Sequence, residues 1–272
     1  EQIMEDAIGS KIADYLIKPV NQNQILISLK KNLNRSKLVS DITSLNYRKE
    51  FRQLGMQLNN RMDALEWAEL YSKLVYWELQ LDKIEDSGMS EIFEMQKKEA
   101  NQLFCKFIED NYLDWHNGVE DGPLFIHNVL KNRILKNNTA NKTLVLVIDN
   151  LRFDQWKVLE PVFNKYFVKE KEEIVYSILP TATQYARNAF FSGLMPSEIA
   201  KKHPQYWKSE EDEGSKNKFE EELLDQNMKR LGKSSLKCSY NKITNVNAGK
   251  KLVEQFHKLK ENDINFIVYN FV

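Results

Sequence analysis

The chain has 272 residues with 39 basic and 39 acidic side chains, so its formal net charge is zero. This balance provides no overall field that would attract nucleic acid or an anionic membrane surface, and any polyanionic ligand therefore needs a local site. A hydrophobic content of 42%, with 9 glycines and 6 prolines, is typical of a soluble globular protein. Collagen-like, low-complexity and wholly disordered chains are excluded.

The length suggests about two average domains. The chain starts without an initiator Met and its last residues, 266–272, stop inside an apolar run, so we expect the intact protein to extend beyond both ends. The two cysteines lie far apart, no signal peptide is visible, and no apolar run approaches the ~18 residues that a membrane span needs. These features predict a cytoplasmic protein without membrane insertion.

Residues 1–36 predict a strand, a turn and a helix. The apolar run Ile12–Ile17 ends at Lys18 and Pro19, and apolar residues then recur at helical spacing between Asn21 and Lys31. The segment Asp-Tyr-Leu-Ile-Lys-Pro that ends at Pro19 resembles the last strand of a response-regulator receiver domain. We therefore interpret residues 1–36 as the C-terminal part of such a domain.

The receiver resemblance implies that Lys18 is the switch residue that approaches a phosphoryl group on an aspartate. It also implies a cis Lys-Pro bond and a Mg²⁺ ion at the receiver site, mostly outside this segment. A buried phosphoaspartate needs a fixed counter-charge, which an ammonium group supplies. The alternative is an ordinary loop, in which a Lys-Pro pair is also common.

Residues 37–138 predict a helical bundle. One stripe of apolar residues steps by three and four positions along a single helix: Trp67, Leu70, Leu74, Trp77, Leu81 and Ile84. A turn at 86–90 separates this helix from the next, with Ser90 as a candidate N-cap, and short links favour antiparallel packing. Aromatic residues at this spacing indicate core packing rather than a cofactor site. We interpret the bundle as a linker or dimerisation element.

Residues 139–272 predict a doubly wound α/β domain, because strand-like and helix-like segments alternate. The first strand, 143–148, is wholly apolar, as in a strand buried on both faces of a parallel sheet. The further elements expected are strands at 173–179, 236–240 and 265–272 and helices around Trp156 and at 184–194, 218–231 and 248–260. The acidic segment 209–218 is typical of a solvated loop.

Asp149 and Thr183 mark the expected carboxyl edge of this sheet. Asp149 ends the first strand, and Thr183 follows the second strand at the start of a helix. Ligands of open parallel sheets bind at that edge, and a helix N-terminus favours a phosphate. A divalent cation held partly by Asp149 would activate the weakly acidic hydroxyl of Thr183. The alternative is that both residues only cap helices.

Three segments carry a second resemblance: Val147–Trp156 (VIDNLRFDQW), Leu179–Asn188 (LPTATQYARN) and Phe191–Pro196 (FSGLMP). They resemble a PglZ domain, a branch of the alkaline phosphatase superfamily, which also contains nucleotide phosphodiesterases with a similar Pro-Thr-x-Thr segment. The order of receiver end, helical bundle and start of a PglZ domain resembles the PorX-type response regulators of the type IX secretion system of Bacteroidetes.

The PglZ resemblance implies that Asp149 is a zinc ligand and that Thr183 is both the nucleophile and a zinc ligand. Thr181 is the fallback for the nucleophile. Arg152 or Arg187 would hold a phosphate oxygen, although a structural pair of Arg152 with Asp154 on the same helical turn is an equal alternative.

The resemblance also implies two Zn²⁺ ions, with the remaining Asp and His ligands on later strands. The four histidines show no HxH or HExxH spacing, and the last strand stops where the family places its next aspartate. We therefore expect this chain to hold half of the metal site.

The resemblance implies a response regulator with a zinc-dependent phosphodiesterase or phosphatase effector that acts on oligonucleotide-type phosphodiesters. Its expected partners are a sensor histidine kinase, which phosphorylates it, and a second copy in a phosphorylation-dependent homodimer. A non-catalytic scaffold that docks a sigma factor or a secretion-motor component is the alternative. A nucleic-acid-binding regulator is a third reading, against which the zero net charge and the lack of a helix-turn-helix pattern count.

Overall fold

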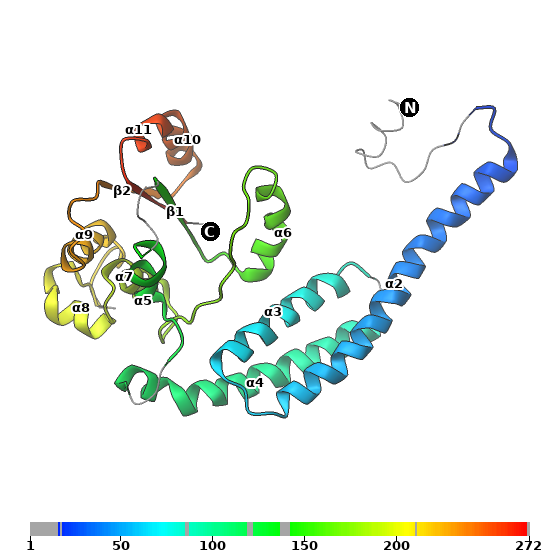
Figure 1. The fold of residues 1–272 in the computed structure, drawn as a ribbon, viewed down its shortest axis with the longest axis horizontal. Coiled ribbons are helices and arrows are strands. Elements are labelled where there is room, and N and C mark those ends of the chain that lie inside the picture. The colour runs from blue at the N-terminus through cyan, green and yellow to red at the C-terminus, as the bar shows by residue number, and fades with distance from the viewer. Residues whose placement is uncertain are drawn as a thin grey trace. The chain divides into compact units, whose positions relative to one another are not determined.

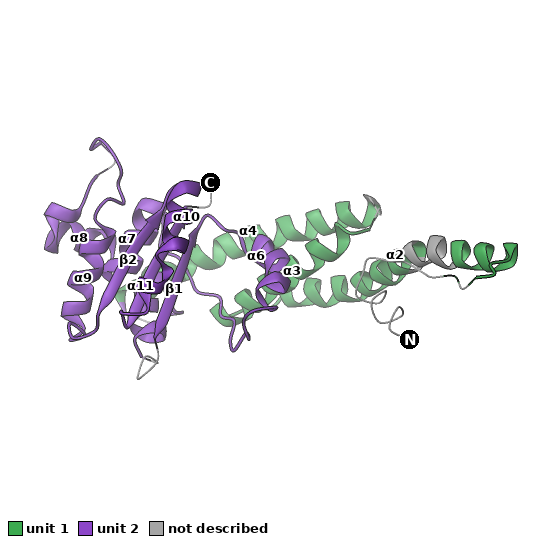
Figure 2. Ribbon diagram, turned by 90° about the horizontal axis from the view of Figure 1, so that it is seen from above, with its two compact units in different colours: residues 1–117 green, residues 118–272 purple. Residues whose placement is uncertain are grey.

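The computed structural model describes residues 16, 18–84, 87–118, 122–136, 142–209 and 211–270. It divides into two compact units, residues 1–117 and 118–272 (Figure 2). None of the helices in these ranges is both long and apolar enough to cross a membrane.

The receiver-like strand expected at 12–17 lies outside the described residues except for Leu16. Lys18 is exposed, and the Lys18–Pro19 peptide bond is cis. The phosphoacceptor aspartate and the Mg²⁺ of a receiver site stay predictions, because neither belongs to the described chain.

The described residues of the first unit form three helices: α2 (Gln22–Leu58), α3 (Ala64–Leu81) and α4 (Ser87–Asn117). Reciprocal side-chain caps fix two of their starts. Asn21 accepts a hydrogen bond from the backbone N–H of Gln24 at 2.9 Å while Gln24 accepts one from Asn21, and Asp63 and Glu66 do the same at α3. α2 runs without a break past residue 36, where the end of the receiver segment was expected.

The apolar stripe predicted for the second helix packs in the core of this unit. α3 and α4 lie along the C-terminal half of α2 (Figure 1). Trp67 packs edge-on against Phe104, with ring centroids 5.3 Å apart, which confirms a packing role for this aromatic residue. The stripe residues Trp67, Leu70, Leu74 and Leu81 are buried, and Trp77 and Ile84 pack partly buried against them.

A hydrogen-bonded pair of polar side chains, Tyr47 and Gln96, is buried in this core. Tyr47 is fully buried and donates to Oε1 of Gln96 at 3.1 Å, while Nε2 of Gln96 donates to the carbonyl of Phe51 at 3.0 Å. Burial raises the pKa of Tyr47 above its usual value.

The turn expected at 86–90 is wrong in its placement, because α4 already begins at Ser87 and Ser90 lies inside it.

The second unit is built on a three-stranded parallel sheet of β1 (Thr143–Asp149), β2 (Cys238–Ile243) and β3 (Ile264–Asn270). The strand order is β1-β3-β2, so β3 is central. The register aligns Asp149 with Asn270 at the carboxyl edge. This sheet and its helices confirm the predicted α/β class.

Helices cover both faces of the sheet. One face packs against α7 and α9, and on the other Asn265 of β3 donates to the carbonyl of Leu259 in α11 at 2.9 Å. The helical elements are α5 (Ile126–Val129), the π-helix η1 (Leu130–Ile134), α6 (Phe153–Phe163), α7 (Thr183–Ser192), α8 (Pro196–Lys202), the 3-10 helix η2 (Pro204–Tyr206), α9 (Glu220–Arg230), α10 (Val246–Glu254) and α11 (Phe256–Leu259).

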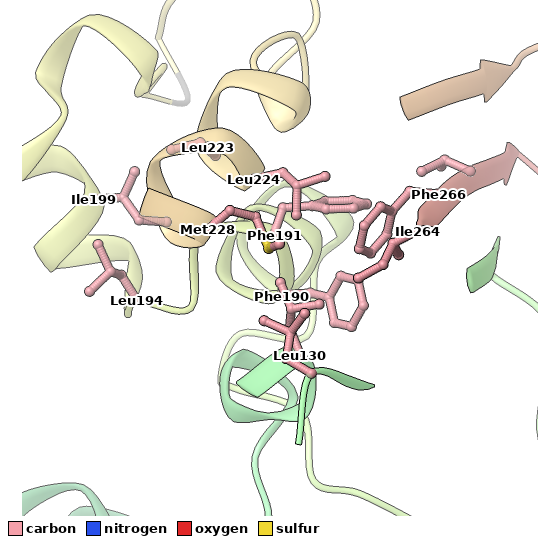
Figure 3. Packing of buried hydrophobic residues seen from close by; sticks show 12 residues of the cluster. Leu130, Phe190, Phe191, Leu194, Ile199, Leu223, Leu224, Met228, Ile264 and Phe266 are labelled. Carbon is pink, nitrogen blue, oxygen red and sulfur yellow. The ribbon is translucent and has the colours of Figure 1, made fainter. Parts of the chain in front are cut away.

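The core of this unit lies between α7, α9 and the sheet. Figure 3 shows apolar side chains from these elements pointing toward one another, with Phe191 beside Phe266 and Leu224. α7 ends at Gly193, whose φ of 63° is left-handed and whose missing Cβ leaves room for the side chain of Asn227. This close contact lets α9 pack directly on α7.

The strand predicted at 173–179 is wrong. The segment is extended, but it makes only an isolated parallel bridge between Tyr176 and Phe125. Its backbone bonds go to the segment before α5, since Tyr176 donates to the carbonyl of Leu124 at 2.9 Å and accepts from Ile126 at 2.8 Å. Residues 122–136 thus pack with the second unit, upstream of the start expected at 139.

Candidate active site

The carboxyl edge of the sheet brings Asp149 and Thr183 together. Asp149 is the last residue of β1, and Thr183 is the first residue of α7. The hydroxyl Oγ1 of Thr183 points to Oδ1 of Asp149 at 3.4 Å, which is long for an O–H···O hydrogen bond. A carboxylate and an alcohol therefore meet at the rim where parallel sheets bind their ligands.

Neither residue is a helix cap. The N-cap of α6 is Arg152, and the N-cap of α7 is Ala182, which makes no side-chain cap hydrogen bond. The carboxylate of Asp149 is engaged by Thr183 and Arg187 instead. The capping alternative for this pair is thus wrong.

Arg187 lies one helical turn after Thr183, on the same face of α7. Its side chain is only 6% exposed. Nη1 donates to Oδ2 of Asp149 and to the side-chain oxygen of Asn270, both at 3.1 Å. Arg187 thereby joins the ends of the two neighbouring strands β1 and β3.

Glu220, the first residue of α9, holds the other side of this guanidinium. Its carboxylate accepts from Nε and Nη2 of Arg187 at 2.7 and 2.5 Å, from the hydroxyl of Tyr240 at 2.6 Å and from Nζ of Lys242 at 3.0 Å. The side chain of Glu220 is fully buried. Two-point pairing with additional donors is the arrangement that makes a buried charge tolerable.

The pKa shifts in this cluster follow from burial and charge. Burial alone would lower the pKa of Arg187, but its hydrogen bond to Glu220 and the charges of Glu220 and Asp149 raise that pKa above its usual value. Burial and the adjacent Glu220 carboxylate raise the pKa of Tyr240. Arg187 therefore stays a cation and Tyr240 stays a neutral donor across the physiological range.

Asn217 secures the start of α7 from the loop before α9. Its Nδ2 donates to the carbonyl of Thr183 at 3.3 Å and to Oδ1 of Asn188 at 3.2 Å, and its own carbonyl accepts from Lys242 at 2.9 Å. This loop and β2 thus fix the backbone that carries the Thr183 hydroxyl.

Two other expected site residues lie apart from this cluster. The guanidinium of Arg152 pairs with the carboxylate of Asp154 at 2.7 and 3.0 Å and lowers the pKa of that carboxyl. Arg152 therefore forms the structural pair with Asp154, which is the alternative to phosphate binding by Arg152. Thr181 lies in the exposed turn before α7, after the cis Leu179–Pro180 bond.

Two known protein families match parts of the chain. Residues 125–272 match the family described as the BREX system PglZ alkaline phosphatase-like domain. The chain belongs to the PglZ family. Residues 37–116 match the PorX response regulator linker domain. The second unit, which contains the PglZ match, is called the PglZ unit below. Together with the linker match, it makes this chain part of a PorX-type response regulator with a hydrolase-like effector. Among curated proteins, none matches the chain.

The alkaline-phosphatase-like family implies zinc, and the PglZ unit fits part of a zinc site. Two oxygens bound to one tetrahedral zinc at about 2.0–2.2 Å lie about 3.4 Å apart, and Oδ1 of Asp149 and Oγ1 of Thr183 have that separation, 3.4 Å. Asp149 would offer Oδ1, because Arg187 engages Oδ2. Within the described ranges no cluster of three or more His, Cys, Asp or Glu side chains is arranged to hold a metal. These two residues therefore supply only part of the coordination.

Sequence reasoning missed four members of the cluster: Glu220, Tyr240, Lys242 and Asn270. Asn270 carried a usable signal, because it is a polar residue at the carboxyl end of an apolar strand, as Asp149 is. Tyr240 and Lys242 alternate along β2 and therefore share a face, but the expected strand ended at residue 240. Glu220 sits among exposed acids in a charged helix and carried no local signal.

Proposed function

We propose that the PglZ unit is a zinc-dependent phosphodiesterase that serves as the output of a phosphorylation-controlled response regulator. The observation that carries this proposal is the contact of the Thr183 hydroxyl with Asp149 at the carboxyl edge of the sheet, 3.4 Å apart. Membership of an alkaline-phosphatase-like family supports it.

The residues of this chain divide the chemistry among them. Thr183 Oγ1 attacks the phosphorus atom, a new P–O bond forms to threonine, and the P–O bond to the leaving group breaks. The proton given up by the Thr183 hydroxyl ends on the leaving oxygen, which departs as an alcohol. Water then attacks the phosphothreonine, releases the phosphate product and restores the hydroxyl. Bound zinc would lower the pKa of the threonine hydroxyl and stabilise charge on the phosphoryl oxygens. Oδ1 of Asp149 lies where it orients the Thr183 hydroxyl. The N-terminus of α7, where Thr183 is the first residue, stabilises the negative charge of the substrate phosphate.

The resemblance to PorX-type regulators supports the remaining parts of the proposal. The substrates are oligonucleotide-type phosphodiesters, the protein is cytoplasmic, and its output controls type IX secretion. A sensor histidine kinase phosphorylates the receiver, in which Lys18 contacts the phosphoryl group beside Mg²⁺. Phosphorylation shifts the protein to a homodimer, and a few kcal/mol suffices to invert such a population.

Metal removal tests the proposed activity. Full-length protein should hydrolyse a chromogenic bis-aryl phosphodiester, lose at least about 100-fold in rate after dialysis against a chelator, and recover when zinc is added back, because the hydroxyl of Thr183 is a weak nucleophile without a cation. The release of the chromophore measures all three rates. Zinc alone in buffer is the control for metal-catalysed background hydrolysis.

An unchanged rate after chelation would contradict zinc dependence. If zinc-loaded protein does not hydrolyse the phosphodiester, the proposed phosphodiesterase activity is contradicted. If such inactive protein still bound a sigma factor or a secretion-motor component in pull-down experiments, the scaffold function would replace the proposal.

A further inference from the structure

A continuous chain of hydrogen bonds links β2 to the candidate nucleophile. It runs from Lys242 and Tyr240 to Glu220, from Glu220 to Arg187, and from Arg187 to Asp149, whose other oxygen lies beside the Thr183 hydroxyl. Side-chain exposure is lowest in the middle of this chain: it is 24% at Lys242, 0% at Glu220, 6% at Arg187 and 17% at Asp149. Solvent therefore competes little for the central members.

Four of the five N–H groups of Arg187 are committed to partners inside the protein. Its Nε and Nη2 are paired with Glu220, and its Nη1 is shared between Asp149 and Asn270. Turning the guanidinium toward a ligand would leave the Glu220 carboxylate without its two-point partner inside the protein, which costs several kcal/mol. A two-point contact of Arg187 with a substrate phosphate would therefore break bonds that hold Glu220 or Asp149.

The charges within the chain also balance. Asp149 and Glu220 carry two negative charges, and Arg187 and Lys242 carry two positive charges. The cluster therefore presents no surplus positive charge to a phosphodiester. What it provides is a fixed orientation for one carboxylate, since Arg187 occupies Oδ2 of Asp149 and leaves Oδ1 on the side of Thr183.

We infer that Glu220 and Arg187 are positioning residues of the candidate active site. Glu220 holds the guanidinium of Arg187, and Arg187 holds the carboxylate of Asp149 so that Oδ1 faces the nucleophile and the metal. This inference rests on the proposed function and deepens it. It replaces the phosphate-binding role that the sequence suggested for Arg187.

Glu220→Gln tests the inference, because glutamine keeps the shape but places an NH₂ group or a weaker oxygen against the donors of Arg187. We expect the zinc affinity, measured by competition with a chromogenic chelator, to fall about 10- to 100-fold, as for partners of metal ligands. We expect kcat to fall at least about 10-fold while KM stays within about twofold, because substrate contacts are unchanged.

Glu221→Gln is the matched control. Glu221 is the next residue in α9 and is exposed, so the same substitution there should leave zinc affinity and both kinetic constants unchanged. Circular dichroism of both variants establishes that the fold is retained.

Tyr240→Phe covers the case in which Glu220→Gln does not fold. It keeps the ring that packs on Phe191 at 5.5 Å and removes one donor from Glu220. We expect the folded variant to lose at least about threefold in zinc affinity and in kcat, since Glu220 then holds Arg187 less firmly.

Three outcomes would overturn the positioning role. The first is a raised KM with unchanged kcat in Glu220→Gln, which would make Arg187 a substrate ligand. The second is wild-type zinc affinity in folded Glu220→Gln. The third is wild-type zinc affinity in Tyr240→Phe if the glutamine variant is unfolded. Failure of the proposed function looks different, because the wild-type protein itself would then not hydrolyse the phosphodiester, or would hydrolyse it at an unchanged rate after zinc is removed.

Discussion

Thr183→Ala should lower kcat for phosphodiester hydrolysis by at least about 10³-fold while the protein stays folded. The substitution removes the only atom of this side chain that can attack phosphorus. It costs little stability, because the hydroxyl makes one long contact of 3.4 Å and Thr183 is not the N-cap of α7. Initial rates with a chromogenic phosphodiester measure the loss, and circular dichroism measures the fold.

Two variants sharpen this result. Thr183→Ser retains a hydroxyl at the same place and should recover much of the lost rate. Thr181→Ala changes the exposed threonine two residues earlier and should leave kcat within about twofold of wild type. A Thr183→Ala variant with more than a tenth of the wild-type kcat would remove Thr183 from the reaction, and a loss at Thr181 alone would move the nucleophile there.

Phe191→Ala should destabilise the PglZ unit by about 3–5 kcal/mol. The side chain is fully buried, and its ring lies 5.5 Å from that of Tyr240 and 6.1 Å from that of Phe266, both edge-on. Truncation leaves a cavity between α7 and the sheet and removes these two aromatic contacts and a third with Phe190, whose ring centroid lies 5.0 Å away. Urea titration with hydrogen exchange read on peptides of α7 and α9 reports this unit separately from the helical unit.

Phe167→Ala is the matched control, because Phe167 is 66% exposed in the same unit. That variant should stay within about 0.5 kcal/mol of wild type. Equal effects of the two substitutions would mean that the core between α7, α9 and the sheet does not carry the stability of the PglZ unit.

The sequence predicts well those parts of the fold whose signal is local. Residues 144–148 are all apolar and are followed directly by Asp149. They form most of β1, which places Asp149 at the carboxyl edge of the sheet. The stripe through Trp67 and Leu70 has the helical period and packs in the core of the first unit. For the stripe, the helical period also decides which side is buried. For β1 the expected burial on both faces is wrong, because Leu144 and Leu146 are 48% and 46% exposed.

The errors arise where distant pairing decides. The segment 173–179 has strand-like residues, but it pairs with none of β1, β2 and β3 and bridges to Phe125 instead. Glu220 is buried because Arg187 from α7 and Tyr240 and Lys242 from β2 converge on it. Nothing in the local pattern of an acidic helix distinguishes that glutamate from its exposed neighbours.

Anomalous diffraction at the zinc absorption edge, from crystals of full-length protein grown with zinc, tests the central claim most directly. We predict a peak between Oδ1 of Asp149 and Oγ1 of Thr183, within about 2.0–2.2 Å of each oxygen, with Arg187 still bound to Oδ2 of Asp149. A peak located elsewhere in the PglZ unit, or no peak beside these two oxygens in zinc-loaded crystals, would contradict a metal-assisted nucleophile at this edge of the sheet.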